Sequence, residues 1–107
     1  MDETRKILKI AKRLDKKSYR KLKQIKDSKE LKDAGEHAII SNLESRFHNL
    51  NEEAKNLEEK DKDLFILKNR LDLVPGKIEF VKALFEMEDV DKVLNLFNSI
   101  EDEIKNV

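Results

Sequence analysis

Glycine and proline are almost absent from this chain of 107 residues, which contains two glycines and one proline. Average usage would make these two types roughly 12% of the chain. Sandwiches and barrels of β-strands need many turns, and turns depend on glycine and proline. The scarcity of both residues therefore favours helices over an all-β fold.

The remaining composition agrees with a helical chain. Ala, Glu, Lys, Leu and Arg make up 55 of the 107 residues, as in long-helix and coiled-coil proteins. Leu, Ile, Val and Phe contribute 33 residues, enough apolar surface for a folded core. We predict one all-α domain over residues 1–107: a small helical bundle or helical hairpin, built on one long central helix.

The N-terminal third predicts one helix and the start of another. Apolar residues recur at helical spacing over about residues 3–26, and the spacing thins at 15–18, where the helix could break. The segment Asp27-Ser28-Lys29-Glu30 resembles a capping box, so a new helix should begin there.

Residues 40–71 carry the most regular pattern, with spacings that alternate between three and four. We call its eight apolar members the seam: Ile40, Leu43, Phe47, Leu50, Ala54, Leu57, Leu64 and Leu71. Asp61 and Lys68 occupy the two polar positions of the same series. Such alternation is typical of a coiled coil, so we predict one long helix over about 28–72. Two points could interrupt it: a bend near Gly35, or a break near Asp61 within the charged run 58–63.

The last third should contain a turn and two helices. Val74-Pro75-Gly76 predicts a turn, because proline disfavours helix in the residue before it. Helices are then expected over about 77–88 and 90–105, with Asp89 or Asp91 as the cap of the second.

Most enzyme classes lack support in the sequence. The chain has no cysteine, no glycine-rich phosphate loop and no serine flanked by glycines. We therefore expect no enzyme, no cofactor and no small-molecule substrate. The longest apolar run, Leu64–Leu67, is far too short to span a membrane, and residues 1–6 do not resemble a signal peptide. A cytoplasmic protein is the expectation.

Two histidines raise the question of a metal site. His37 and His48 are about 16 Å apart on a helix and cannot share an ion. Glu44, His48 and Glu52 lie four residues apart on one stripe, where neighbours could supply two zinc ligands. A metal-dependent enzyme or storage bundle is the least favoured hypothesis, because ligands from another helix or subunit would be needed.

Basic residues concentrate near the N-terminus. Residues 1–34 carry a net charge of +7, against −3 for residues 35–76 and −4 for residues 77–107. Six basic residues form a stripe at helical spacing: Lys6, Lys9, Arg13, Lys16, Arg20 and Lys23. The stripe could contact phosphates or an acidic partner, or could simply balance the acidic half of the same chain. A membrane-surface role has less support, because the apolar face of this helix is narrow.

Two functional hypotheses are favoured over the metal site. The first is a non-enzymatic interaction or scaffold module that self-associates through the seam, as a homodimer or larger assembly. An antiparallel pairing centred near residue 64 or 65 would then bring Asp61 of one copy to Lys68 of the other. The alternative is a nucleic-acid-associated accessory protein that uses the basic stripe.

Overall fold

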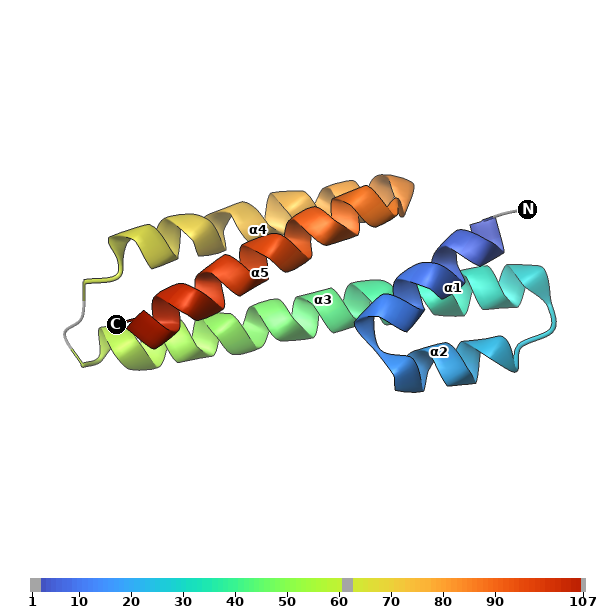
Figure 1. Ribbon diagram of the computed structural model, residues 1–107, viewed down its shortest axis with the longest axis horizontal. Coiled ribbons are helices and arrows are strands. Elements are labelled where there is room, and N and C mark those ends of the chain that lie inside the picture. The colour runs from blue at the N-terminus through green and yellow to red at the C-terminus, as the bar shows by residue number, and fades with distance from the viewer. Residues whose placement is uncertain (1–2, 61–62, 107) are drawn as a thin grey trace.

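The protein is all-helical, as predicted. The computed structural model describes residues 3–60 and 63–106, which form five helices and no strand (Figure 1). The helices are α1 (Glu3–Leu14), α2 (Lys16–Lys23), α3 (Ser28–Glu58), α4 (Phe65–Leu84) and α5 (Met87–Asn106).

The 31-residue helix α3 runs along most of the molecule (Figure 1). The antiparallel pair α4 and α5 packs along its C-terminal part, and α1 packs on its N-terminal part. The short helix α2 folds back beside α1 and the beginning of α3. The bundle is elongated, with principal dimensions of 52 × 22 × 16 Å.

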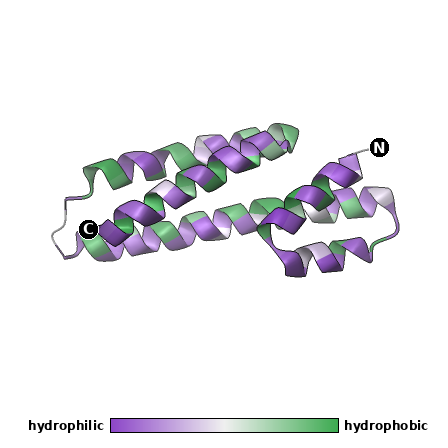
Figure 2. Ribbon diagram, viewed as in Figure 1, coloured by the Kyte–Doolittle hydropathy of each residue, from purple (hydrophilic) through white to green (hydrophobic). Residues whose placement is uncertain are grey.

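One apolar core joins four helices, and a second, smaller one holds α2. In the main core Ile7, Leu43, Val74 and Phe97 are almost completely shielded from solvent and come from α1, α3, α4 and α5. The second cluster consists of the buried residues Ala11, Leu22 and Leu31. Figure 2 shows apolar and hydrophilic segments alternating along α3, α4 and α5.

The predicted N-terminal helix is broken at Asp15, at the point where the pattern thins. Asp15 is extended, with φ −158° and ψ 108°, and its carboxylate accepts hydrogen bonds from the Lys17 amide (3.1 Å) and the Ser18 hydroxyl (2.8 Å). The residue therefore caps α2. Asp27 caps α3 in the same way, accepting from the Lys29 amide at 3.0 Å, so the predicted start of that helix is confirmed.

The prediction of one continuous helix over 28–72 is wrong, and Asp61, where the alternative break was placed, lies outside the described residues. The chain leaves the helix after Glu58 and starts α4 at Phe65, whose amide donates to Asp63 at 3.2 Å. The described residues of the charged run, 58–60 and 63, are all exposed, whereas the reversal between α3 and α4 lets Leu64, Leu67 and Leu71 join the main core. Burial of these leucines outweighs continuation of the helix. Gly35, where a bend was considered, does not interrupt the helix, because α3 begins at Ser28 and Gly35 is a buried residue within it.

The turn predicted at Val74-Pro75-Gly76 is wrong as well, because all three residues lie inside α4. Val74 and Ile78 flank the proline and are both buried. In a helix these two positions, four apart, lie on the same face, so their packing against the core favours a helix that continues through Pro75. Pro75 itself is exposed.

The corner between the last two helices lies earlier than predicted. Helix α4 ends at Leu84, and Phe85 adopts the left-handed conformation with φ 48°. Its side chain packs against the main core, which holds this unfavourable backbone conformation in place. Helix α5 begins at Met87, so Asp89 and Asp91 lie inside it and the cap predicted from them is wrong.

Candidate interaction surfaces

The seam lies inside the bundle. Leu43, Leu50, Ala54, Leu64 and Leu71 are buried, and the partly buried Ile40, Phe47 and Leu57 pack against the same core. The helices that cover it belong to the same chain. The seam residues are therefore occupied in a single copy of the protein.

Lys68, one of the two polar positions of the series, lies outside this core. Lys68 is exposed and its Nζ lies 2.5 Å from the Glu58 carboxylate, across the connection between α3 and α4. Asp61 lies outside the described residues, so the predicted approach to Lys68 of another copy stays a prediction.

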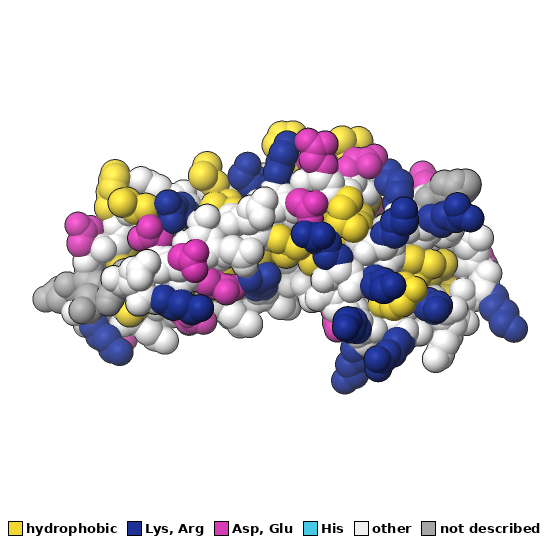
Figure 3. Space-filling model, in the orientation of Figure 1, with side chains coloured by type: hydrophobic (Ala, Val, Ile, Leu, Met, Phe, Trp, Pro, Cys, Tyr) yellow, Lys and Arg dark blue, Asp and Glu magenta, His cyan; other side chains and the backbone are white. Residues whose placement is uncertain are grey.

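A different apolar surface is exposed. Five large apolar side chains lie on α4 and are 55–71% exposed: Phe65, Ile66, Leu73, Phe80 and Leu84. Ile66, Leu73 and Phe80 are seven residues apart, about two helical turns, so they line one face together with Leu84. Phe65, one residue before Ile66, lies about 100° around the helix from it and borders this face. We call all five residues the outer stripe. Figure 3 shows apolar side chains along the α4 edge of the molecule.

Polar contacts fix the two flanks of α4 and leave the outer stripe free. On one flank Lys82 Nζ lies 3.4 Å from the Glu44 carboxylate of α3. On the other, Arg70 lies 3.1 Å from the Glu103 carboxylate of α5. The pKa of Lys82 is raised by its contacts with the Glu79 and Glu44 carboxylates. The helix is thus anchored with its apolar outer face toward solvent.

The outer stripe was not predicted from the sequence, because a turn was expected at 74–76. That turn divided the stripe between two predicted helices. Had residues 65–84 been treated as one helix, two apolar sets would have been visible. One is the buried set Leu67, Leu71, Val74, Ile78 and Val81, and the other is the outer stripe.

The predicted basic stripe is divided between α1 and α2. Two of its members form ion pairs within the bundle, and the other four are exposed. Lys6 binds the Glu86 carboxylate at 2.7 Å, and the Arg13 guanidinium lies 2.9 Å from Asp91 Oδ1. That oxygen is buried and has no hydrogen bond within the described part of the chain, so Arg13 supplies its compensating charge. These two residues hold α1 against the C-terminal helices. The other four, Lys9, Lys16, Arg20 and Lys23, are exposed.

Helix α2 presents a uniformly basic surface. All five of its exposed residues are basic: Lys16, Lys17, Arg20, Lys21 and Lys23. We call them the basic face. Tyr19 lies half-buried beside it, with Lys23 Nζ 5.3 Å and Lys12 Nζ of α1 5.6 Å from the ring centroid. In Figure 3 a group of dark blue side chains covers this end of the molecule.

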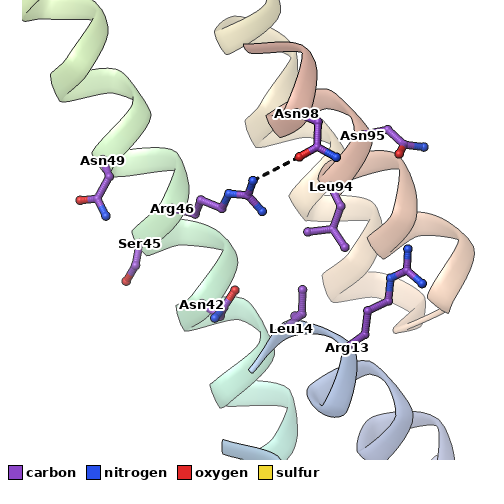
Figure 4. Close-up of a pocket in the computed structure, with 9 residues that line it drawn as sticks. All are labelled: Arg13, Leu14, Asn42, Ser45, Arg46, Asn49, Leu94, Asn95 and Asn98. Atoms are coloured by element: carbon purple, nitrogen blue, oxygen red, sulfur yellow. Dashed lines mark hydrogen bonds between the residues drawn. The ribbon is translucent and has the colours of Figure 1, made fainter. Parts of the chain in front are cut away.

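A polar groove of about 620 Å³ lies between α3, α5 and the end of α1 (Figure 4). Amide and hydroxyl side chains dominate its lining, among them Asn42, Ser45, Asn49, Asn95 and Asn98. Arg46 crosses it, donating to Asn98 (3.4 Å) and Glu101 and stacking 5.0 Å from the Phe97 ring centroid. Its lining contains no carboxylate, histidine or thiol and offers no acid–base pair.

The candidate zinc ligands Glu44, His48 and Glu52 do not form a metal centre within the described residues. His37 and His48 are exposed on α3, Glu44 is paired with Lys82, and Glu52 lies 3.7 Å from Lys55. Within residues 3–60 and 63–106, no group of three ligand side chains comes together.

No helix in the described part of the chain is both long enough and apolar enough to cross a membrane. Comparison with protein-family models, with curated proteins and with solved structures finds no match to this chain.

Proposed function

We propose that this protein is a non-enzymatic helical interaction module that self-associates by packing α4 of one copy against α4 of another. The observation that carries the proposal is the outer stripe, five large apolar side chains exposed on a single helix. Exposed apolar surfaces of this size in a water-soluble fold favour association with another apolar surface. The seam, buried within one chain, is replaced by the outer stripe as the proposed interface.

The area of the outer stripe is sufficient for a dimer. With about 200 Å² for each whole side chain, exposures of 55–71% leave roughly 600 Å² of apolar surface. Burying it on two copies removes about 1,200 Å² from water, the lower end of stable protein interfaces. Polar residues at the rim would add to this area.

The spacing of the outer stripe suits two copies related by a two-fold axis. Ile66 and Phe80 are equally distant from Leu73 in the sequence, so an antiparallel α4 pair centred on Leu73 brings Ile66 opposite Phe80 of the other copy. Asn69 then faces Lys77 of the other copy, which avoids a like-charge contact. Arg70, next to the stripe, is already neutralised by Glu103.

The decisive experiment uses the two-fold position of Leu73. Sedimentation at two protein concentrations should show a dimer for the wild type and a monomer for both Leu73→Glu and Leu73→Lys. Mixing these two variants should restore a dimer, because opposite charges then meet at the axis. Recovery on mixing requires two copies of this chain and separates self-association from binding to another protein.

Cysteine cross-linking supplies a second measurement, since the chain has no native cysteine. Leu73→Cys should form a disulfide-linked dimer under mild oxidation, because residues near the axis meet the distance requirement of about 4.4–6.8 Å between Cα atoms. Ser41→Cys, exposed on α3, is the matched control and should stay monomeric. A monomer at every concentration, or equal cross-linking at both positions, would reject the α4 interface.

A further inference from the structure

We infer that the basic face of α2, together with Lys9 and Lys12 of α1, binds the phosphate backbone of nucleic acid without reading its sequence. This second surface is independent of the outer stripe. It is formed by the break at Asp15, which turns α2 back beside α1 and brings the lysines of both helices to one end of the molecule (Figures 1 and 3).

Part of the charge on α2 is unfavourable for the helix: Arg20, Lys21 and Lys23 in the last turn suit the helix dipole, but the cations of the first turn and the like-charge pairs do not. Its first turn contains Lys16 and Lys17 and no acidic residue, although the N-terminal end of a helix favours negative charge. Lys17 and Lys21 are four residues apart, as are Lys16 and Arg20, and like charges at this spacing repel. Cations that repel one another along one helix are expected where their charge serves a ligand.

Neutralisation within the chain does not account for the basic face. Intramolecular ion pairs of the predicted stripe involve Lys6 and Arg13, both on α1. Among the described residues, no carboxylate lies within 4.0 Å of a charged nitrogen of Lys16, Arg20 or Lys23, nor of the two remaining lysines of the face. The ion pairs between the basic stripe and the acidic part of the chain are therefore formed by α1. Among the described residues, none neutralises the five cations of α2.

The ring of Tyr19 holds two of the lysine side chains in position. Its ring lies near the ammonium groups of Lys12 and Lys23, which come from different helices. Cation–π attraction restrains these flexible side chains before any ligand arrives, which lowers the entropy lost on binding. Lys12 is in this way joined to the basic face.

The geometry favours nucleic acid over a membrane. The apolar sides of the two helices are buried through Ile7, Ala11 and Leu22, so no apolar face remains to enter a lipid surface. Five cations on a helix of eight residues, about 12 Å long, instead match a dense, regular series of phosphates. Because four of the five are lysines on a convex surface, we expect positioning on the backbone and no base recognition.

The test measures binding to a short generic DNA duplex by fluorescence anisotropy at several salt concentrations. The affinity should fall with salt, with a slope of log K against log salt of about −3 to −5. The variant Lys16→Gln/Arg20→Gln/Lys23→Gln should bind at least tenfold more weakly at about 50 mM salt, with a slope shallower by about 2–3.

The matched control is Lys55→Gln/Lys60→Gln/Lys105→Gln, which removes the same charge from exposed positions outside α1 and α2. Its affinity should stay within about twofold of the wild type. Thermal melting by circular dichroism verifies that both variants are folded. The Leu73→Glu variant should keep its affinity per chain, so that failure of self-association and failure of this inference are distinguishable.

Three results would overturn the inference. One is the absence of duplex binding at about 50 mM salt, where weak phosphate contacts are detectable. Another is an equal loss of affinity in the two triple variants, which would indicate a general charge effect. The third is binding to polyglutamate or to anionic vesicles in place of nucleic acid.

Discussion

Gly35 of α3 lies directly against Ile7 of α1, so closely that a β-carbon at Gly35 would overlap the Cγ2 methyl group of Ile7. The same β-carbon would be 3.7 Å from Cδ1 of Leu22 in α2. One glycine therefore sets how closely the first three helices approach one another. Because α2 is held by this packing, the position of the basic face depends on it.

Gly35→Ala should lower the free energy of unfolding by about 1–3 kcal/mol, because the extra methyl group overfills the contact with Ile7. Alanine is the better helix former by about 1 kcal/mol, which offsets only part of that cost. Gly76→Ala is the matched control, since a β-carbon there meets nothing within 4 Å. It should raise stability by up to about 1 kcal/mol in urea unfolding. Equal effects of the two changes would contradict the close approach at Gly35.

Pro75→Ala should stabilise the chain. A proline inside a helix removes one backbone hydrogen bond and costs about 3 kcal/mol. Since Pro75 is exposed within α4, alanine can restore the bond without disturbing the core. We expect the free energy of unfolding to rise by about 1–3 kcal/mol. A decrease would show that the chain turns at 74–76 in solution.

Leu43→Ala should lower the free energy of unfolding by about 2–5 kcal/mol, because it leaves a cavity at a fully buried position of α3. Glu53→Ala, exposed on the same helix, should change it by less than about 0.5 kcal/mol. Chemical unfolding of the two variants at equal concentration measures the difference. A silent Leu43→Ala would mean that the seam is not the inner face of α3.

Asp15 should make the stability of α2 depend on acidity. The Ser18 hydroxyl and then the Lys17 amide donate to its carboxylate and lower its pKa below the ordinary value of 3.8. A carboxylate whose pKa is lowered by folding stabilises the fold above its unfolded pKa and loses this effect as the pH falls through the folded value. The melting temperature of Asp15→Ala should therefore lie below that of the wild type at pH 6, and the gap should narrow below about pH 4.

Asp15→Asn tests the cause. Asparagine is also a good helix cap but does not titrate, so its difference from Asp15→Ala should persist at low pH. If the gap between wild type and Asp15→Ala stays constant from pH 6 to pH 3, the cap does not form in solution.

The sequence alone determined that the chain is helical, because the scarcity of glycine and proline and the 3.6-residue spacing of apolar residues act locally. It also indicated the cap at Asp27 and a break at 15–18, whereas the cap at Asp15 was found in the structure, although it too rests on a short acceptor that binds an amide two residues away. Both helix starts follow from contacts that involve only neighbours in the chain. The concentration of positive charge near the N-terminus was visible for the same reason.

Tertiary structure decided where the long helix ends and which apolar residues face solvent. The seam pattern continues without a change of phase from Leu57 to Leu64, so spacing cannot distinguish a straight helix from one that reverses. The reversal of the chain between α3 and α4 is preferred to a straight helix because Leu64 and Leu71 then reach the core. Likewise Pro75 stays helical and Phe85 adopts a positive φ because their surroundings are buried. Such effects arise between residues far apart in the chain, and they also left the outer stripe of α4 exposed while burying the seam.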